Sequence, residues 1–271
     1  MIRSLYTAAS GMKTQQMNVD TISNNLANVN TTGYKKESLE FKSLLYENMG
    51  KADMDKQGKG RPVNLQVGHG VKPVGTVRSY TIGTMQKTDN PLDIAITGDG
   101  FFAIKNHLDE EVYTKDGSFK IALVDNRQRL ITSEGYRVMD VNDEPIYFDR
   151  NIDIKKIEIG SDGSFSIMDS DGQPIDMDIK LKIVQFKNVN GLEALGNNLL
   201  RATSSSGEPI AENDDDDIVK STIIQGTLEG SNVQVVEEMV NLIVAQRAYE
   251  VSSKAIQTSD EMLSQANNLK R

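Results

Sequence analysis

Apolar residues recur every seven positions at both ends of this 271-residue chain, and this spacing constrains the fold more than any other feature. The N-terminal repeat has two interleaved series, Leu5, Met12, Val19, Leu26 and Ala8, Gln15, Ile22, Val29. The C-terminal repeat has one series, Val235, Leu242, Tyr249, Ile256, Leu263, beside a stripe of mostly small residues. Heptad spacing is typical of helices that pack along one another. We therefore predict a long helix at each end of the chain.

The N-terminal heptad segment carries very little charge for a helix exposed to water. Only Arg3, Lys13 and Asp20 are charged among residues 1–34, whereas about a quarter of the residues of a soluble domain are charged. Uncharged polar side chains exchange hydrogen bonds with neighbouring chains without the desolvation cost of a buried charge. The segment is therefore predicted to pack on several sides, although spacing alone favours an ordinary core helix within one chain.

The start of the second helix is indicated by a capping signal. Ser231 with Gln234 matches a capping box, in which the two side chains satisfy free backbone N–H groups of the first turn. The helix is predicted to start near Asn232.

The middle of the chain changes to strands and tight turns. Asp-Gly pairs between apolar runs are the strongest short-range signal for β-hairpins. They occur at Asp99-Gly100, Asp116-Gly117, Asp162-Gly163 and Asp171-Gly172. Residues 51–73 are glycine-rich and are predicted to be an extended, weakly structured connector, and residues 212–217 (ENDDDD) a solvated loop.

The predicted fold class is α+β. N- and C-terminal α-helices are expected to form a coiled-coil-like assembly domain, joined by an extended connector to a mainly antiparallel β middle domain.

Charge and residue usage exclude several classes of protein. Lys and Arg total 30 against 39 Asp and Glu residues, a formal charge of −9 that repels nucleic-acid phosphates. No apolar run approaches the roughly 20 residues that span a bilayer, and the first residues lack the apolar core of a cleaved secretory signal. The absence of cysteine excludes disulfides and Cys-ligated metals. We predict no nucleic-acid partner and no lipid-spanning segment.

No motif carries recognisable enzyme or metal chemistry. Residues 169–172 (DSDG) lack the third oxygen ligand and the terminal Glu of a calcium loop, so a plain turn is expected. A glycosidase that uses two carboxylates among Asp89, Asp93 and Asp99 stays open, because sequence does not show their separation. We predict no enzymatic role, no metal site and no cofactor.

Four stretches of the sequence together resemble the bacterial flagellar rod and hook protein family. They are MIRSLYTAASGMKTQQMNVDTISNNLANVNTTGYKK at residues 1–36, NPLDIAITGDGFF at 90–102, YTKDGSF at 113–119 and LEGSNVQVVEEMVNLIVAQRAYEVSSKAIQTSDEML at 228–263. They cover both ends and the first half of the middle. The modest length and the connector at 41–74 favour the distal-rod branch of the family, with proximal-rod and hook-type subunits as alternatives.

The resemblance implies a division of the chain by role. Residues 1–33 and 228–271 would form the helical rod-core assembly domain, residues 34–74 the connector and residues 75–227 a β-rich outer domain. Asparagines would mediate contacts within and between subunits, and Gly33 would cap the first helix. The expected assembly-interface residues are Leu5, Met12, Val19, Asn24, Asn25, Leu26, Asn28, Val235, Leu242, Tyr249, Ile256 and Leu263.

The resemblance also implies a mechanical function. Copies would self-assemble in a helical array, with other flagellar rod and hook proteins as partners, into a rigid hollow shaft that transmits torque from motor to hook. Export by the flagellar type III apparatus would place the chain in the basal body, within the cell envelope. In the isolated monomer the terminal stripes are expected to be largely disordered. The alternative from a different class is a stalked β-domain binding module.

Overall fold

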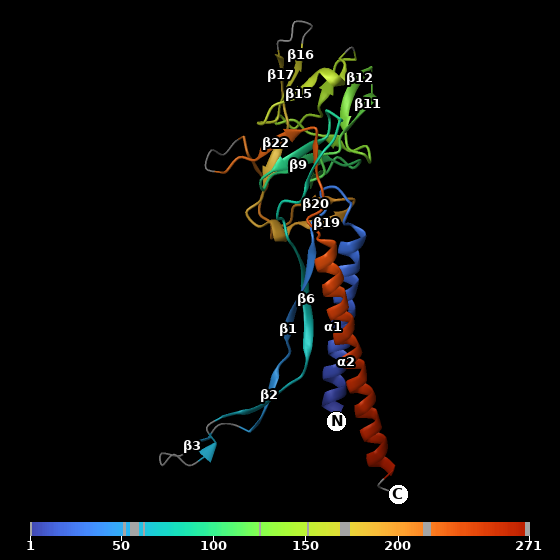
Figure 1. The fold of residues 1–271 in the computed structure, drawn as a ribbon. Coiled ribbons are helices and arrows are strands. Elements are labelled where there is room, and N and C mark those ends of the chain that lie inside the picture. Colours follow the sequence, from blue (N-terminus) through green and yellow to red (C-terminus); the bar gives the residue numbers. More distant parts are fainter. Residues whose placement is uncertain are drawn as a thin grey trace. The chain divides into compact units, whose positions relative to one another are not determined.

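The computed structural model describes residues 2–50, 53–54, 60–61, 63–124, 126–150, 152–168, 174–213 and 218–268. They form two compact units. The helical unit comprises Met1–Ala27, Glu37–Arg78 and Gln234–Arg271, and the β unit comprises Asn28–Lys36 and Ser79–Val233. A helix at each end and a mainly antiparallel β middle confirm the α+β class (Figure 1).

Two long helices lie side by side in the helical unit and run in opposite directions (Figure 1). They are α1 (Ile2–Ala27) and α2 (Val235–Asn268). Near one end of the pair, Ser4 Oγ lies 3.3 Å from Ser259 Oγ. Near the other, Asn25 Nδ2 donates a hydrogen bond to Glu238 Oε2 at 3.0 Å. The predicted pair of long terminal helices is confirmed.

The first helix ends earlier than predicted. α1 stops at Ala27, well before Gly33. Gly33 has φ +67°, and an added Cβ would lie 2.8 Å from the backbone nitrogen of Asp116. Glycine is therefore required at this position for a left-handed backbone and a close passage of two segments, and not as a helix cap.

The second helix starts later than predicted. α2 begins at Val235, and the Ser231 hydroxyl accepts a hydrogen bond from Val233 N at 3.2 Å, in a short turn ahead of the helix. The backbone carbonyl of Gln234 accepts the first helical bond, from Glu238 N at 3.0 Å. The predicted capping box is therefore wrong, because Ser231 satisfies a donor outside the helix.

The connector in the helical unit is a paired ribbon. Its strands are β1 (Glu37–Ser43), β2 (Tyr46–Gly50), β3 (Asp53–Met54), β4 (Gly60–Arg61), β5 (Leu65–Gly68) and β6 (Val71–Arg78). β1 pairs with β6, β2 with β5 and β3 with β4, all antiparallel. The Tyr46 ring lies 3.2 Å from where a Cβ of Gly68, its partner across the ribbon, would be. Within residues 51–73, the paired residues 53–54, 60–61, 65–68 and 71–73 contradict the expectation of a weakly structured connector, and residues 51–52, 55–59 and 62 lie outside the described residues.

A ten-stranded antiparallel sheet forms the centre of the β unit (Figure 1). Its strands are β9 (Phe101–Lys105), β10 (Glu111–Thr114), β11 (Lys120–Val124), β12 (Arg127–Ile131), β13 (Arg137–Val138), β14 (Tyr147–Phe148), β18 (Ile183–Gln185), β19 (Glu193–Gly196), β20 (Leu199–Arg201) and β21 (Ile210–Ala211). The main order is β11-β12-β13-β9-β10-β20-β19; β14 pairs with β12, and β18 pairs with β9 and β21.

Smaller antiparallel sheets complete the β unit. β15 (Ile157–Ile159), β16 (Ser164–Met168) and β17 (Pro174–Lys180) form one sheet. β7 (Met85–Lys87) pairs with β23 (Thr227–Glu229), and β8 (Ile94–Thr97) pairs with β22 (Thr222–Gln225). Short 3₁₀ turns lie at Ile154–Lys156 and Val189–Gly191.

The hydrophobic core of the β unit lies on both faces of β9. Successive side chains of a strand point to opposite faces, so Phe102 and Ile104 join a large cluster, whereas Phe101 and Ala103 join a smaller one. Isoleucine is the commonest residue of the large cluster, which also holds two pairs of phenylalanines in edge-to-face contact, Phe102 with Phe119 and Phe148 with Phe165. The unbroken apolar run of β9 therefore reflects burial on two sides.

Only one described Asp-Gly turn joins two paired strands. Asp162-Gly163 connects β15 and β16 as predicted. Asp99-Gly100 and Asp116-Gly117 do not make hairpins, because β8 pairs with β22 and β10 pairs with β9 and β20. An added Cβ at Gly117 would overlap the Ile94 carbonyl oxygen, and at Gly100 it would overlap the Ile183 side chain. These two glycines admit close passage of distant segments instead.

Part of the predicted acidic loop is a buried structural element. Glu212 is buried, and its carboxylate accepts hydrogen bonds from Ser221 N at 2.8 Å and from Ser221 Oγ at 2.6 Å. The expectation that residues 212–217 are all solvated is therefore wrong for Glu212. Residues 214–217 and the predicted turn at 169–172, with its Asp-Gly pair, lie outside the described residues.

Candidate assembly interface

Small and polar side chains face each other between α1 and α2. Ser4 meets Ser259, and an added Cβ on Gly11 would lie 3.4 Å from Ser252 Oγ. The buried residues of α2 lie seven or fourteen positions apart: Glu238, Ala245 and Ser259. Short side chains at heptad spacing let the two backbones come close along a continuous seam. We call this contact the helix seam.

Asn25 joins three elements at one end of the helix seam. It is 1% exposed. Its Nδ2 donates to Glu238 Oε2 at 3.0 Å and to the Glu37 carbonyl at 2.8 Å, and its Oδ1 accepts from Glu37 N at 2.9 Å. The amide pairs with the start of β1 as a neighbouring strand would, and it holds α2 at the same time. These contacts lie within one chain, and any role of Asn25 between copies stays a prediction.

The other predicted interface residues are not fully buried by the chain itself. Those that are half-buried are Leu5, Met12, Val19, Leu26, Asn28, Leu242, Ile256 and Leu263. Those that are exposed are Asn24, Val235 and Tyr249. Val19 and Tyr249 line a groove of about 420 Å³ between α1 and α2, together with Gln16, Gln246 and Glu250. Apolar surface on both helices is thus left accessible to another molecule.

A second apolar face of α2 was missed by the heptad analysis. Val236 is 75% exposed and Val251 69%. Val240, Ile243 and Val244 are exposed as well. At 3.6 residues per turn these positions lie on the side of α2 opposite Glu238, Ala245 and Ser259. The run VVEEMVNLIV contains the signal, since its apolar residues exceed one heptad stripe.

The carboxylates considered for a glycosidase have different surroundings. Asp93 is buried and accepts a hydrogen bond from Asn90 Nδ2 at 2.8 Å, whereas Asp89 and Asp99 are exposed. Within the described ranges no group of three His, Asp or Glu residues is placed to hold a metal ion. None of the helices in the described part of the chain has the length and apolarity needed to cross a membrane.

Three family descriptions match the sequence. Residues 5–35 match flagella basal body rod proteins. Residues 95–167 match the flagellar hook protein FlgE/F/G D1 domain. Residues 224–269 match the C-terminal part of flagellar basal body rod FlgEFG proteins. The first and third matches cover most of the described lengths of α1 and α2, and the second covers most of the strands around β9.

Full-length relatives show the same similarity. The chain is 46% identical to flagellar basal-body rod protein FlgG of Borreliella burgdorferi, over all of both chains. It is 40% identical to FlgG of Buchnera aphidicola subsp. Schizaphis graminum, over 99% of this chain and all of the relative. It is 39% identical to FlgG of Bacillus subtilis, again over all of both chains.

Proposed function

This chain belongs to the flagellar basal-body rod protein family and is a structural subunit of the distal rod, and we propose that its copies self-assemble into a rigid hollow shaft that transmits torque from motor to hook. The observation that carries the proposal is the apolar surface of the helical unit. Exposed valines and isoleucine on α2 lie opposite the helix seam, so one chain covers one side of α2 and leaves the other to a neighbour.

A contact between two different faces leads to open-ended growth. The α2 face that carries Val240 and Ile243 differs from the groove beside Val19 and Tyr249. Heterologous contacts that do not close into a ring extend as a helical array. Such an array spreads a twisting load over many packed contacts, which suits a drive shaft.

We propose the following division of labour within the subunit. Residues 1–33 and 228–271 form the rod-core assembly domain, in which the twelve interface residues named from the sequence contact other copies. Residues 34–74 contact adjacent subunits, and residues 75–227 form the outer domain. The exposed side chains of Leu45, Tyr46 and Met49 on the ribbon support the second part of this proposal.

The chain is part of the basal body and assembles with other rod and hook proteins. We propose that the type III export apparatus carries it across the inner membrane into the cell envelope, and that its role is mechanical and not enzymatic. The structural nature of the family supports the second statement.

Electron microscopy of the purified full-length chain and its Leu26→Asp variant tests self-assembly. Wild-type chains at high concentration should form tubes or other polymers. The variant should not, because a carboxylate without a partner would enter a packed contact, and its β unit should stay folded by circular dichroism. Leu108→Asp is the matched control, since Leu108 is 78% exposed in a turn of the β unit. Discrete stalked particles from the wild type, or normal polymers from Leu26→Asp, would contradict the proposal.

A further inference from the structure

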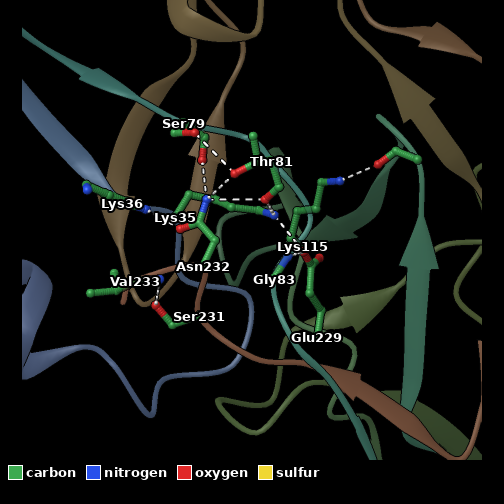
Figure 2. A network of polar contacts seen from close by, with 11 residues as sticks. Lys35, Lys36, Ser79, Thr81, Gly83, Lys115, Glu229, Ser231, Asn232 and Val233 are labelled. Atoms are coloured by element: carbon green, nitrogen blue, oxygen red, sulfur yellow. Dashed lines mark hydrogen bonds and ion pairs between the residues drawn. The ribbon is translucent and has the colours of Figure 1, made fainter. Parts of the chain in front are cut away.

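The chain passes between its two units at four places, after Ala27, Lys36, Arg78 and Val233. Residues next to three of these places meet in one polar network inside the β unit, shown in Figure 2. We call it the junction network. Its members are Lys35, Lys36, Ser79, Thr81, Gly83, Glu229 and Asn232.

The amide of Asn232 closes a ring of hydrogen bonds through all three segments. Its Oδ1 accepts from Lys36 N at 2.7 Å, and its Nδ2 donates to the Ser79 carbonyl at 2.8 Å. Ser79 N in turn donates to the Lys36 carbonyl at 2.9 Å. Nδ2 also lies 3.0 Å from Thr81 Oγ1 (Figure 2). One side chain therefore fixes the backbone beside three crossing points.

A buried ion pair joins the same three segments independently. Lys35 Nζ lies 2.6 Å from Glu229 Oε1 and donates to the Thr81 carbonyl at 2.8 Å. Gly83 N donates to the same carboxylate oxygen at 2.8 Å. The side chains of Lys35 and Glu229 are 5% and 1% exposed. Charged hydrogen bonds are strong where water is excluded, so this pair reinforces the ring around Asn232.

We propose that Asn232 is a positioning residue for rod assembly, which holds residues 35–36, 79–83 and 229–233 in one register. The inference rests on the proposed function, because it gives the junction network a role in a load-bearing subunit. A load that passes along the chain between the units at three of the four crossing places passes through these segments. Backbone segments that are joined by several hydrogen bonds and an ion pair deform less under load than segments that are not joined.

The test uses the full-length chain with Asn232→Asp. This change keeps the size and the acceptor oxygen, but it replaces the donating NH₂ with an oxygen that repels the carbonyls of Ser79 and Thr81. Hydrogen exchange at the Lys36 and Ser79 amides should become about ten-fold faster or more, while the β9 amides keep their protection. In cells that carry the variant as their only copy, swimming should be lost or strongly reduced.

Asn188→Asp is the matched control. Asn188 also donates from its amide to a backbone carbonyl, that of Ser205 at 2.9 Å, but it is exposed, whereas Asn232 is half-buried, and it lies outside the junction network. In the Asn188→Asp variant, hydrogen exchange at the Lys36 and Ser79 amides should match the wild type. Cells that carry this variant as their only copy should swim like the wild type. Asn232→Ala, which adds no charge, should reproduce the faster exchange.

Several outcomes would overturn the inference. Unchanged exchange at Lys36 and Ser79 is one, and wild-type swimming of Asn232→Asp is another. Loss of protection throughout β9 in both Asn232 variants would show a folding role in place of a positioning role. Deletion of the whole gene separates this inference from the proposed function: if cells without the chain swim normally the function itself fails, and if they do not, only the role of Asn232 is in question.

Discussion

At the scale of single residues, the helix seam depends on an amide placed beside a buried carboxylate. Asn25 Nδ2 donates both to Glu238 Oε2 and to the Glu37 carbonyl. Glu238 is 1% exposed, and a buried carboxylate is costly unless donors surround it. An aspartate has nearly the same shape as an asparagine, but it has no such donor at neutral pH.

Asn25→Asp should therefore weaken the helix pair by about 3 kcal/mol or more, because two carboxylates would face each other in a buried place. Thermal melting of assembled polymers, followed by helical circular dichroism, should move to lower temperature. Asn30→Asp is the control, since Asn30 is exposed beyond the end of α1. Equal melting temperatures for the two variants would refute the assignment of Asn25.

Lys115 is a second residue whose surroundings have a measurable consequence. It is buried, its Nζ donates to the Gly98 carbonyl at 2.7 Å, and it lies 5.1 Å from the centroid of the Phe101 ring. The pKa of Lys115 is lowered from 10.5 to about 8, chiefly by burial and next by the positive charge of Lys35, against the opposing effect of Glu229, Asp99 and Glu212. The folded β unit thus binds this proton more weakly than the unfolded chain.

The free energy of unfolding of the β unit should rise as the pH increases from about 8 to 10.5. In this window the unfolded chain keeps the Lys115 proton and the folded chain has released it, so unfolding takes up a proton and becomes less favourable as protons are removed. Lys115 contributes an increase of about 3 kcal/mol at most. The measurement is urea unfolding at about pH 8 and at about pH 10.5. The difference between the two free energies of unfolding should be smaller in Lys115→Met than in the wild type by this amount.

The exposed Lys120 on β11 provides the control for this pH dependence. Lys120→Met should keep the wild-type rise, because it removes a lysine of the same unit and leaves Lys115 in place. If the free energy of unfolding rises equally with pH in Lys115→Met and in the wild type, the buried Lys115 is not the cause of the pH dependence.

At the scale of elements, α2 has two faces with different tasks. One face, with Glu238, Ala245 and Ser259, packs against α1 through small and polar groups. The opposite face presents branched apolar side chains to the surroundings, among them Ile243 and Val244. A stable helix in a soluble monomer normally turns such residues inward. This exposed apolar face is the one that we propose another copy covers.

Ile243→Glu should abolish polymer formation while it changes the stability of the monomer by no more than about 0.5 kcal/mol, since Ile243 is 56% exposed within one chain. Sedimentation of polymers and urea unfolding measure the two effects separately. Leu123→Glu, an exposed residue on β11 of the β unit, should assemble normally. Polymers of Ile243→Glu at wild-type yield would exclude this face from the interface.

At the scale of the whole molecule, the two units differ in how much apolar surface they bury. The β unit has two clusters of buried aromatic and aliphatic side chains around β9. Along the described lengths of α1 and α2, only Ile22 and Ala245 are buried apolar residues. Each fully buried large apolar side chain contributes roughly 1.5–3 kcal/mol, so the helix pair gains little from burial within one chain.

Hydrogen exchange on a dilute monomer should therefore show strong protection in β9 and weak protection at residues 4–29 and 235–263. Helices that gain little from packing open easily in water. The same helical amides should become protected in assembled polymers, while those of β9 change little. Strong protection of both helices in the dilute monomer would show that the chain folds completely before assembly.

Sequence periodicity was sufficient to predict the two long helices and the β character of the middle. Heptad spacing and Asp-Gly turns are local patterns, and residues three to seven positions apart report helical or extended geometry directly. The family resemblance added the role in the flagellar rod. Neither the periodicity nor the resemblance revealed which helix positions are covered within one chain. The helix seam is made by small and polar residues such as Ser4 and Gly11, which are not part of the apolar heptad series.

Only the tertiary structure decided the contacts between residues far apart in sequence. It showed that Gly117 admits the backbone of Ile94 and Gly100 the side chains of distant segments, that strands β1 to β6 pair as a ribbon, and that Asn232 joins three distant segments. Turn residues and side-chain amides can form hydrogen bonds with many different partners. Which partner each one meets depends on the segments that the packed core brings together. The local sequence thus determined the elements, and long-range packing determined what each side chain meets.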